Sequence, residues 1–271
     1  MIKRYHEAPK SLFNMVQEYT DGDYALVHLF EEDHEYFDMF VKAVEEGRDV
    51  ILDNSIFELG TSFDHDRYAY WIKQLKPTWF IVPDVWKNGP ATVEMFEAFL
   101  EKHPRVTLPG KVIGVAQGYT LEEVAKCYKQ IEPKCDMVAF NLDFATYCDL
   151  PDVGIPYCIR MSLGRRKMLQ DLYEAGVINT RKPHHLLGCG VPQEICWYPK
   201  SWTWIRSIDT CNPVIHGMMG KAYDERLPGL TYKITDPKMC ECMDAQVGPM
   251  ELNLVKYNLM QIRSYDAMRE E

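Results

Sequence analysis

The sequence lacks several features that would place it in a well-known class. No apolar run approaches the roughly 20 residues that a membrane-spanning helix requires, and no apolar segment follows the start of the chain as in a secretory signal. A Gly-x-x-x-x-Gly-Lys-Ser/Thr loop and a strand-bounded Gly-x-Gly-x-x-Gly are both missing, so a cradle for nucleotide phosphates is poorly supported. No Gly-x-Ser-x-Gly elbow occurs, although Ser-His-Asp and Cys-His catalysis stay open. We expect a cytoplasmic protein that contacts no membrane.

A disulfide framework and a full set of metal ligands are also missing. The nine cysteines are odd in number and scattered, which fits reduced thiols in a cytoplasm. Cys240 and Cys242 form a single short pair, whereas a structural zinc site needs four ligands. His184 and His185 are adjacent, so on a strand they would point to opposite faces and could not share one ion. We expect no metal cofactor, with zinc at Cys240 and Cys242 as the alternative.

Positive charge is scarce. The formal net charge of −10 argues against broad, non-specific binding to nucleic acid, but a local basic track on an acidic body is compatible with it. The candidates for such a track are Arg165, Arg166, Lys167, Arg181, Lys182, Lys221 and Arg226. The competing interpretation is that these runs are only solvated surface.

The chain of 271 residues is long enough for one large α/β domain. Short apolar runs alternate with helical patterns and predict strands at 23–30, 49–53, 78–82, 111–116, 136–140, 155–161, 185–188 and 205–208. Helices are predicted at 34–46, 63–76, 90–103, 120–131, 163–175 and 250–269, after a lead-in of about twenty residues with a short helix ending near Tyr19. This order favours a (β/α)8 barrel, with a doubly wound open sheet as the alternative. We predict one domain over 1–271, irregular at 212–249.

Polar residues follow the predicted strands where those strands end. They are Asp53, Asp84, Gln117, Asn141, the turn Gly188-Cys189-Gly190, and Asp209. The strand ends of such a barrel share one mouth, where catalytic groups gather. Carboxylates, amides and turn backbone groups there would suit a polar heterocycle, with Asp209 as a nucleophile. The competing interpretation is that each side chain only caps the helix that follows it.

Several segments together resemble the tRNA-guanine transglycosylase superfamily. They are Val112–Gly118 (Val-Ile-Gly-Val-Ala-Gln-Gly), His184–Pro192 (His-His-Leu-Leu-Gly-Cys-Gly-Val-Pro) and Ser207–Cys211 (Ser-Ile-Asp-Thr-Cys). Ile51–Phe57 is similar to the general-base segment of that family in a changed form, and Asn258–Arg263 is similar to its final helix. The resemblance covers about residues 48 to 265.

The resemblance implies a barrel enzyme that exchanges guanine in a polynucleotide for a 7-deazaguanine of the preQ0 type. It makes Asp209 the nucleophile and Asp53 the general acid/base. Base-binding roles would fall to Asp84, Gln117, Gly118, Asn54, Phe57, Phe140, Asn141, Gly188, Cys189 and Gly190. Contacts with nucleic acid would come from Arg165, Arg166, Lys167 and Lys221.

The chain also departs from the pattern of that family. The tRNA enzymes of the superfamily hold a zinc through three cysteines and a histidine, and only Cys240 and Cys242 remain here. A compact version without zinc looks most like the phage and bacterial branch that modifies DNA, which would place the protein in the host cytoplasm if phage-encoded. The alternatives are an enzyme acting on tRNA, a non-catalytic nucleic-acid-binding partner subunit, and an unrelated barrel hydrolase or metal enzyme.

Overall fold

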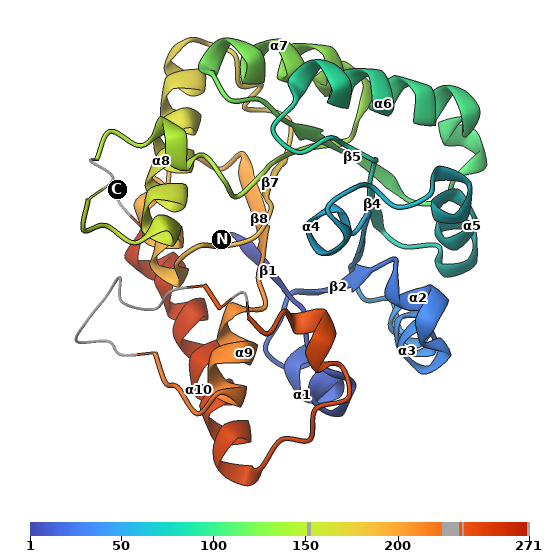
Figure 1. The fold of residues 1–271 in the computed structure, drawn as a ribbon, viewed down its shortest axis with the longest axis vertical. Helices are drawn as coiled ribbons and strands as arrows, with labels where there is room; N and C mark the ends of the chain where they lie inside the picture. Colours follow the sequence, from blue (N-terminus) through green and yellow to red (C-terminus); the bar gives the residue numbers. More distant parts are fainter. Residues whose placement is uncertain (151–152, 224–232, 235, 270–271) are drawn as a thin grey trace. The chain divides into compact units, whose positions relative to one another are not determined.

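The computed structural model describes residues 1–150, 153–223, 233–234 and 236–269. Within them, eight strands pair in sequence order and close into a parallel barrel (Figure 1). The strands are β1 (Lys3–His6), β2 (Gly22–Leu26), β3 (Val50–Asp53), β4 (Trp79–Ile81), β5 (Lys111–Ala116), β6 (Met137–Phe140), β7 (His184–Leu186) and β8 (Ile205–Asp209). The predicted (β/α)8 barrel is confirmed, and the open sheet is wrong.

Helices follow the strands along the chain. They are α1 (Phe13–Gln17), α2 (Leu29–Glu32), α3 (His34–Glu45), α4 (Ile56–Leu59), α5 (His65–Leu75), α6 (Gly89–Lys102), α7 (Leu121–Ile131), α8 (Tyr157–Glu174), α9 (Asn212–Met218) and α10 (Pro249–Ser264). Short 3-10 turns are η1 (Lys10–Leu12), η2 (Arg105–Thr107), η3 (Glu132–Lys134), η4 (Ala145–Tyr147), η5 (Pro192–Trp197), η6 (Met239–Cys242) and η7 (Tyr265–Met268). None of the described helices has the length and apolar character needed to cross a membrane.

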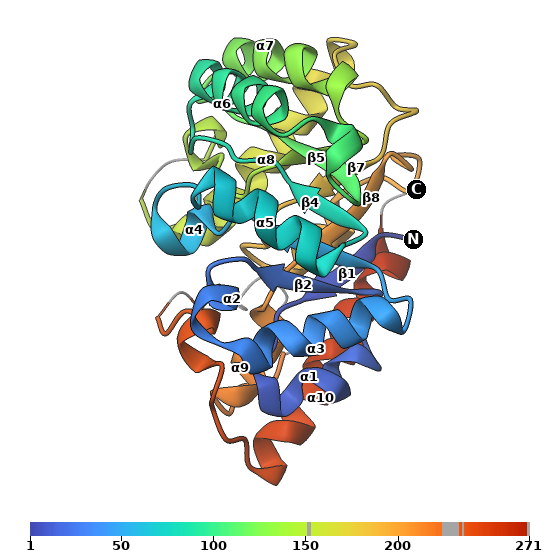
Figure 2. The ribbon, with the colours of Figure 1, turned by 90° about the vertical axis from the view of Figure 1, so that its right-hand side faces the viewer.

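Local sequence chemistry accounts for where several helices begin. The side chains of Asp33, Asp64 and Asn88 accept a hydrogen bond from a backbone N–H in the first turn of α3, α5 and α6. Thr120 and Glu123 form a capping box at the start of α7, in which each side chain accepts from the backbone of the other. Helices α6 and α7 lie side by side in both views (Figures 1 and 2).

One predicted strand is wrong and one strand was not predicted. The segment 155–161 runs into α8, which begins at Tyr157, because the alternation of Ile155, Tyr157, Ile159 and Met161 imitates a strand next to and inside a helix. The first strand, β1, falls in the predicted lead-in. A search for apolar runs misses this strand because the charged Arg4 is buried within it. The Nη2 atom of Arg4 lies 2.7 Å from Oδ2 of Asp21, which neutralises its charge.

Other boundaries also move. The strand predicted at 23–30 ends at Leu26, and α2 begins at Leu29. The segment 212–249 is less irregular than predicted, because it contains α9 and η6; residues 224–232 and 235 lie outside the described part. Helix α9 packs closely on α10 (Figures 1 and 2), since a Cβ on Gly217 would lie 2.4 Å from the backbone nitrogen of Val255.

The chain divides into two compact units. The first comprises Met1–Asp21, Asn141–Thr180 and Leu186–Glu271, and the second comprises Gly22–Phe140 and Arg181–His185. The second unit carries β2 to β6, and its core includes the fully buried run Val50, Ile51 and Leu52 of β3. The first carries β1 and β8, and its core includes Ile208, Leu259 and Ile262. That the chain forms one domain stays a prediction.

Candidate active site

In the second unit, Asp84 is the centre of a buried polar cluster. It lies just beyond β4 and is 3% exposed. Asn54 donates to Asp84 Oδ1 at 2.8 Å, and Gln117 donates to Asp84 Oδ2 at 2.7 Å. Burial raises the pKa of the Asp84 carboxyl, while the two amide donors act in the opposite direction. Three side chains that follow β3, β4 and β5 are thus brought together, as predicted for Asn54, Asp84 and Gln117.

Asp53 is the last residue of β3, where it pairs in register with Leu26 of β2. It is 8% exposed, and its Oδ2 accepts a hydrogen bond from the backbone N–H of Ser55 at 3.0 Å. Ser55 has a left-handed φ of +59°, an unfavourable conformation for a residue with a Cβ. This tight turn directs the Asp53 carboxylate back toward its own backbone and fixes its orientation.

A tyrosine behind these strands was missed by sequence reasoning. Tyr68 on α5 is fully buried, and its hydroxyl donates to the carbonyls of Leu52 and Ile81, at 2.9 and 2.8 Å. Burial raises the pKa of Tyr68 well above its ordinary value, helped by the negative charge of Asp53. Tyr68 therefore ties β3 to β4 as a neutral donor. A tyrosine on an otherwise apolar helix face carried no signal of this role.

Gln117 has both ends of its amide engaged. Its Nε2 donates to Asp84, and its Oε1 accepts from the backbone N–H of Lys87 at 3.0 Å. Gly118 follows, where a Cβ would lie 2.8 Å from both Glu123 Cβ and the Val124 nitrogen. A glycine at 118 is therefore required by the packing of this loop on α7, and the two hydrogen bonds define the direction of the Gln117 amide.

In the first unit, Asp209 is the last residue of β8 and is 5% exposed. It pairs in register with Tyr5 of β1, and the next N–H, of Thr210, donates to the Tyr5 carbonyl at 2.9 Å. Asp209 Oδ1 accepts a hydrogen bond from the backbone N–H of Gly188 at 2.9 Å. Gly188 has a φ of +62°, which suits glycine. The Gly188-Cys189-Gly190 turn and Asp209 are therefore in direct contact.

The turn that holds Asp209 rests on a buried ion pair. Arg165 of α8 and Glu194 of η5 are both 0% exposed and are joined by two hydrogen bonds of 2.7 and 2.9 Å. Arg165 also donates to the carbonyls of Leu187 at 2.7 Å and Gly188 at 2.8 Å. Tyr198 donates to Glu194 at 2.5 Å. The guanidinium therefore supports the backbone of the turn from behind.

This placement does not fit the prediction that Arg165 contacts nucleic acid, because a fully buried guanidinium has no open surface for a phosphate. The neighbouring cations are engaged as well. Arg166 donates to the Trp197 carbonyl at 2.7 Å and lies 5.2 Å from the centre of the Trp202 ring. Lys167 pairs with Asp171 at 2.9 Å. Lys221 is exposed, and its predicted contact stays a prediction.

The remaining predicted pocket residues differ in how buried they are. Phe140 is fully buried, with its ring near those of Tyr128 and His184. Asn141 is 3% exposed, and its Oδ1 accepts from the Asp143 backbone N–H at 2.7 Å. Cys189 is fully buried, which raises its thiol pKa. Phe57, on α4, is 37% exposed. The ring of Phe140 and the thiol of Cys189 therefore belong to the core, and substrate contact through their backbone stays a prediction.

The described residues do not assemble a set of metal ligands. Among them, no group of three or more His, Cys, Asp or Glu residues is arranged to hold an ion. Cys240 and Cys242 are half-buried in η6. His184 Nε2 contacts the Tyr128 hydroxyl at 2.9 Å, whereas the His185 ring stacks near Tyr24. The zinc site that the resemblance implies therefore finds no fitting ligand set in this part of the chain.

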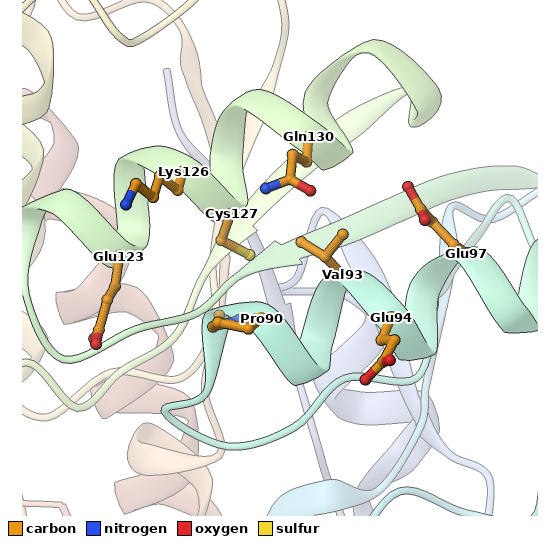
Figure 3. A pocket seen from close by; sticks show the side chains of 9 residues that line it. Pro90, Val93, Glu94, Glu97, Glu123, Lys126, Cys127 and Gln130 are labelled. Atoms are coloured by element: carbon orange, nitrogen blue, oxygen red, sulfur yellow. The ribbon is translucent and has the colours of Figure 1, made fainter.

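A pocket of about 570 Å³ lies between α6 and α7 in the second unit (Figure 3). Val93 and Cys127 face each other between the two helices, and Glu94, Glu97 and Glu123 line the pocket (Figure 3). None of the predicted site residues lines it. This pocket is therefore separate from the residues at the strand ends.

No protein-family model and no curated protein sequence matches the chain. The functional interpretation therefore depends on the site residues and on the motifs that they form.

Proposed function

We propose that this chain is a base-exchange transglycosylase. It would replace guanine in a polynucleotide, DNA in preference to tRNA, with a preQ0-type 7-deazaguanine through a covalent aspartyl-glycosyl intermediate. The proposal takes Asp209 as the nucleophile and Asp53 as the general acid/base.

The contact between Gly188 and Asp209 is the observation that carries the proposal. The segments His184–Pro192 and Ser207–Cys211 were singled out separately in the sequence, and the hydrogen bond of 2.9 Å from Gly188 N–H to Asp209 Oδ1 joins them. A backbone donor fixes the direction of a carboxylate. An oriented aspartate at the end of a barrel strand is suited to nucleophilic attack.

The proposed chemistry has two displacements. The Asp209 carboxylate forms a bond to C1′ of the nucleoside as the bond from C1′ to N9 of guanine breaks, through an oxocarbenium-like transition state. Asp53, protonated, gives its proton to the departing guanine. The incoming 7-deazaguanine then gives its ring N–H proton to Asp53 and attacks C1′, which releases Asp209. Two inversions leave the configuration at C1′ unchanged.

The Asp84 cluster supports recognition of a guanine-like edge. Guanine presents N–H donors beside a carbonyl acceptor, and a site with a carboxylate next to an amide offers the complementary groups. Asp84 and Gln117 are both nearly fully buried, at 3% and 1% exposed, and the hydrogen bond between them fixes the direction of the groups that a base would meet. The target base has to leave the stack to reach such a site.

The preference for DNA comes from the resemblance. The tRNA enzymes of that superfamily hold a zinc through three cysteines and a histidine, of which only Cys240 and Cys242 remain in this sequence. A compact version without this ligand set looks most like the branch that modifies DNA.

Trapping of the covalent intermediate tests the proposal. Wild-type protein mixed with a guanine-containing oligonucleotide should form an adduct, detected by mass spectrometry under denaturing conditions. Asp209→Ala should form none. Asp53→Asn should form it about 10²- to 10⁴-fold more slowly, the usual contribution of a general acid.

Asp244→Ala is the matched control, because that carboxylate is 85% exposed and pairs with Lys10 at the surface. This variant should form the adduct at the wild-type rate. An adduct that persists in Asp209→Ala would overturn the assignment of the nucleophile.

A further inference from the structure

Three side chains on two neighbouring loops of the second unit form what we call the aromatic rim: Trp86, Lys87 and Tyr119. Trp86 and Lys87 follow β4, and Tyr119 follows β5, the next strand of the barrel. Tyr119 is 55% exposed, and Trp86 and Lys87 are half-buried. All three residues therefore lie where the parallel strands end, on the side that carries Asp84 and Gln117.

The rim combines ring faces with a cation. The ammonium of Lys87 lies 5.6 Å from the centre of the Tyr119 ring. The Trp86 ring lies 5.9 Å from that of Phe57, at an angle of 34°. Aromatic rings beside a lysine stack with nucleobases of any sequence, while the cation meets the phosphates.

The rim is anchored to the proposed base-binding cluster. Lys87 has a left-handed φ of +55°, which is strained for a residue with a side chain. Its N–H donates to Gln117 Oε1 at 3.0 Å, and the same amide donates to Asp84 at 2.7 Å. The backbone N–H of Tyr119 is held by Glu123 Oε2 at 2.7 Å. A nucleotide stacked on the rim would therefore be held at a defined position relative to Asp84.

The net charge of the chain favours such a surface in a nucleic-acid enzyme. The formal net charge is −10, Arg165 is buried in an ion pair with Glu194, and Arg166 is half-buried and donates to the Trp197 carbonyl. Long-range attraction of a polyanion is therefore weak. Stacking does not depend on net charge, so it can supply the affinity that a basic track would otherwise supply.

We propose that the aromatic rim binds the nucleotides next to the exchanged guanine in a single-stranded polynucleotide. Trp86 and Tyr119 stack on the flanking bases, and Lys87 contacts a backbone phosphate. This inference rests on the proposed function for the polynucleotide as partner, but it concerns flanking nucleotides and not the base that is exchanged.

Binding of a fluorescently labelled oligothymidine by anisotropy is the test, because this ligand contains no guanine and does not report base exchange. Tyr119→Ala should weaken binding about tenfold, the effect expected for loss of one stacked base. Tyr119→Phe should retain wild-type affinity, since it keeps the ring. Trp86→Ala should weaken binding similarly, and Trp86→Phe should restore most of it.

Tyr70→Ala is the matched control. Tyr70 on α5 is 43% exposed and also lies beneath a cation, with the Arg67 guanidinium 4.7 Å from its ring centre. It is not on a strand-end loop, so its loss should leave the affinity unchanged. An equal loss with Tyr70→Ala, or unchanged affinity with Tyr119→Ala, would overturn the proposal.

Lys87 is tested separately by its charge. Lys87→Gly removes the cation but suits the left-handed backbone, so the fold is retained. It should reduce the slope of log K against log salt concentration by about 0.7, the value for one phosphate contact on a single strand. Lys87→Arg should keep the slope. An unchanged slope in Lys87→Gly contradicts the phosphate contact.

The same measurements separate this proposal from the enzyme assignment. Rim-dependent binding without any base exchange would leave the rim standing and remove the transglycosylase. Failure of wild-type protein to bind oligothymidine or oligouridine overturns the rim proposal. A dimer in sedimentation that Tyr119→Ala dissociates also overturns it, because the rim would then be a contact between copies.

Discussion

At the scale of single residues, Asp84 shows how burial and hydrogen bonding oppose each other. Burial raises its pKa, whereas the amide donors Asn54 and Gln117 favour its charged form, and burial is the larger effect. The side-chain amide of Gln117 is itself fixed, because its Oε1 accepts from the Lys87 N–H while its Nε2 donates to Asp84. The carboxyl is therefore held in one direction at some cost to the folded state.

This cost predicts a dependence of stability on pH. Because the pKa of Asp84 is higher in the folded than in the unfolded protein, the folded state binds more protons between the two values. The Asp84 contribution to stability is therefore full below the ordinary carboxyl pKa of about 3.9 and falls as the pH rises toward the raised folded value. Urea unfolding of wild type and Asp84→Asn over this pH range measures the difference.

Asp84→Asn should be less stable than the wild type at low pH, since its NH2 group faces one of two donors that are already anchored, and it lacks the titrating carboxyl. The wild-type advantage over Asp84→Asn should shrink as the pH rises. An advantage that is independent of pH would contradict the assigned shift.

At the scale of elements, α8 holds the turn after β7 through one buried guanidinium. Arg165 joins Glu194 to the carbonyls of Leu187 and Gly188, and Gly188 in turn donates to Asp209. Close packing reinforces the arrangement, since a Cβ on Gly190 would lie 2.6 Å from the Cys158 carbonyl oxygen. The direction of the Asp209 carboxylate thus depends on a helix that precedes it by about forty residues in the chain.

Removing the guanidinium should be costly. Arg165→Met leaves Glu194 as an unpaired buried charge, so the free energy of unfolding should fall by about 3–5 kcal/mol. The free energy of unfolding of Arg165→Lys should lie between those of the wild type and Arg165→Met, because an ammonium cannot form the bidentate pair. The double variant Arg165→Met with Glu194→Met should recover part of the loss. A loss below about 1 kcal/mol in Arg165→Met, measured by urea unfolding, would contradict this account.

The sequence predicted the elements whose burial is apolar and missed those whose burial is polar. Strands such as β3 and β5 are apolar runs that are buried almost continuously, so their pattern was sufficient. Strand β1 contains Lys3, Arg4 and His6, and its burial depends on the partner Asp21, which lies 17 residues away in the chain. The start of α8 was misread because its apolar residues alternate over a short window.

The same distinction applies to the site. Asp53 and Asp209 end their strands, and Asp84 and Gln117 follow theirs; these positions were predicted from the strand pattern alone. The role of Arg165 could not be predicted in this way, because a run of basic residues has the same sequence pattern whether it is solvated or buried. Only the distant Glu194, whose position is set by the tertiary fold, decides between these states.

At the scale of the whole molecule, the closed parallel barrel places the end of every strand on one side, and the net charge of −10 limits how a polynucleotide is attracted. An acidic protein that acts on a polyanion needs short-range recognition, through base edges and stacked rings. The Asp84 cluster and the aromatic rim supply these two kinds of contact in the proposed mechanism.

Mass analysis of nucleosides is the most direct measurement of the central claim. DNA and tRNA are isolated from cells that express the chain together with a supply of 7-deazaguanine bases. The account predicts a 7-deazaguanine deoxynucleoside in DNA that is lost in the Asp209→Ala variant. Modification of tRNA alone would contradict the choice of DNA, and unmodified DNA and tRNA would contradict the transglycosylase itself.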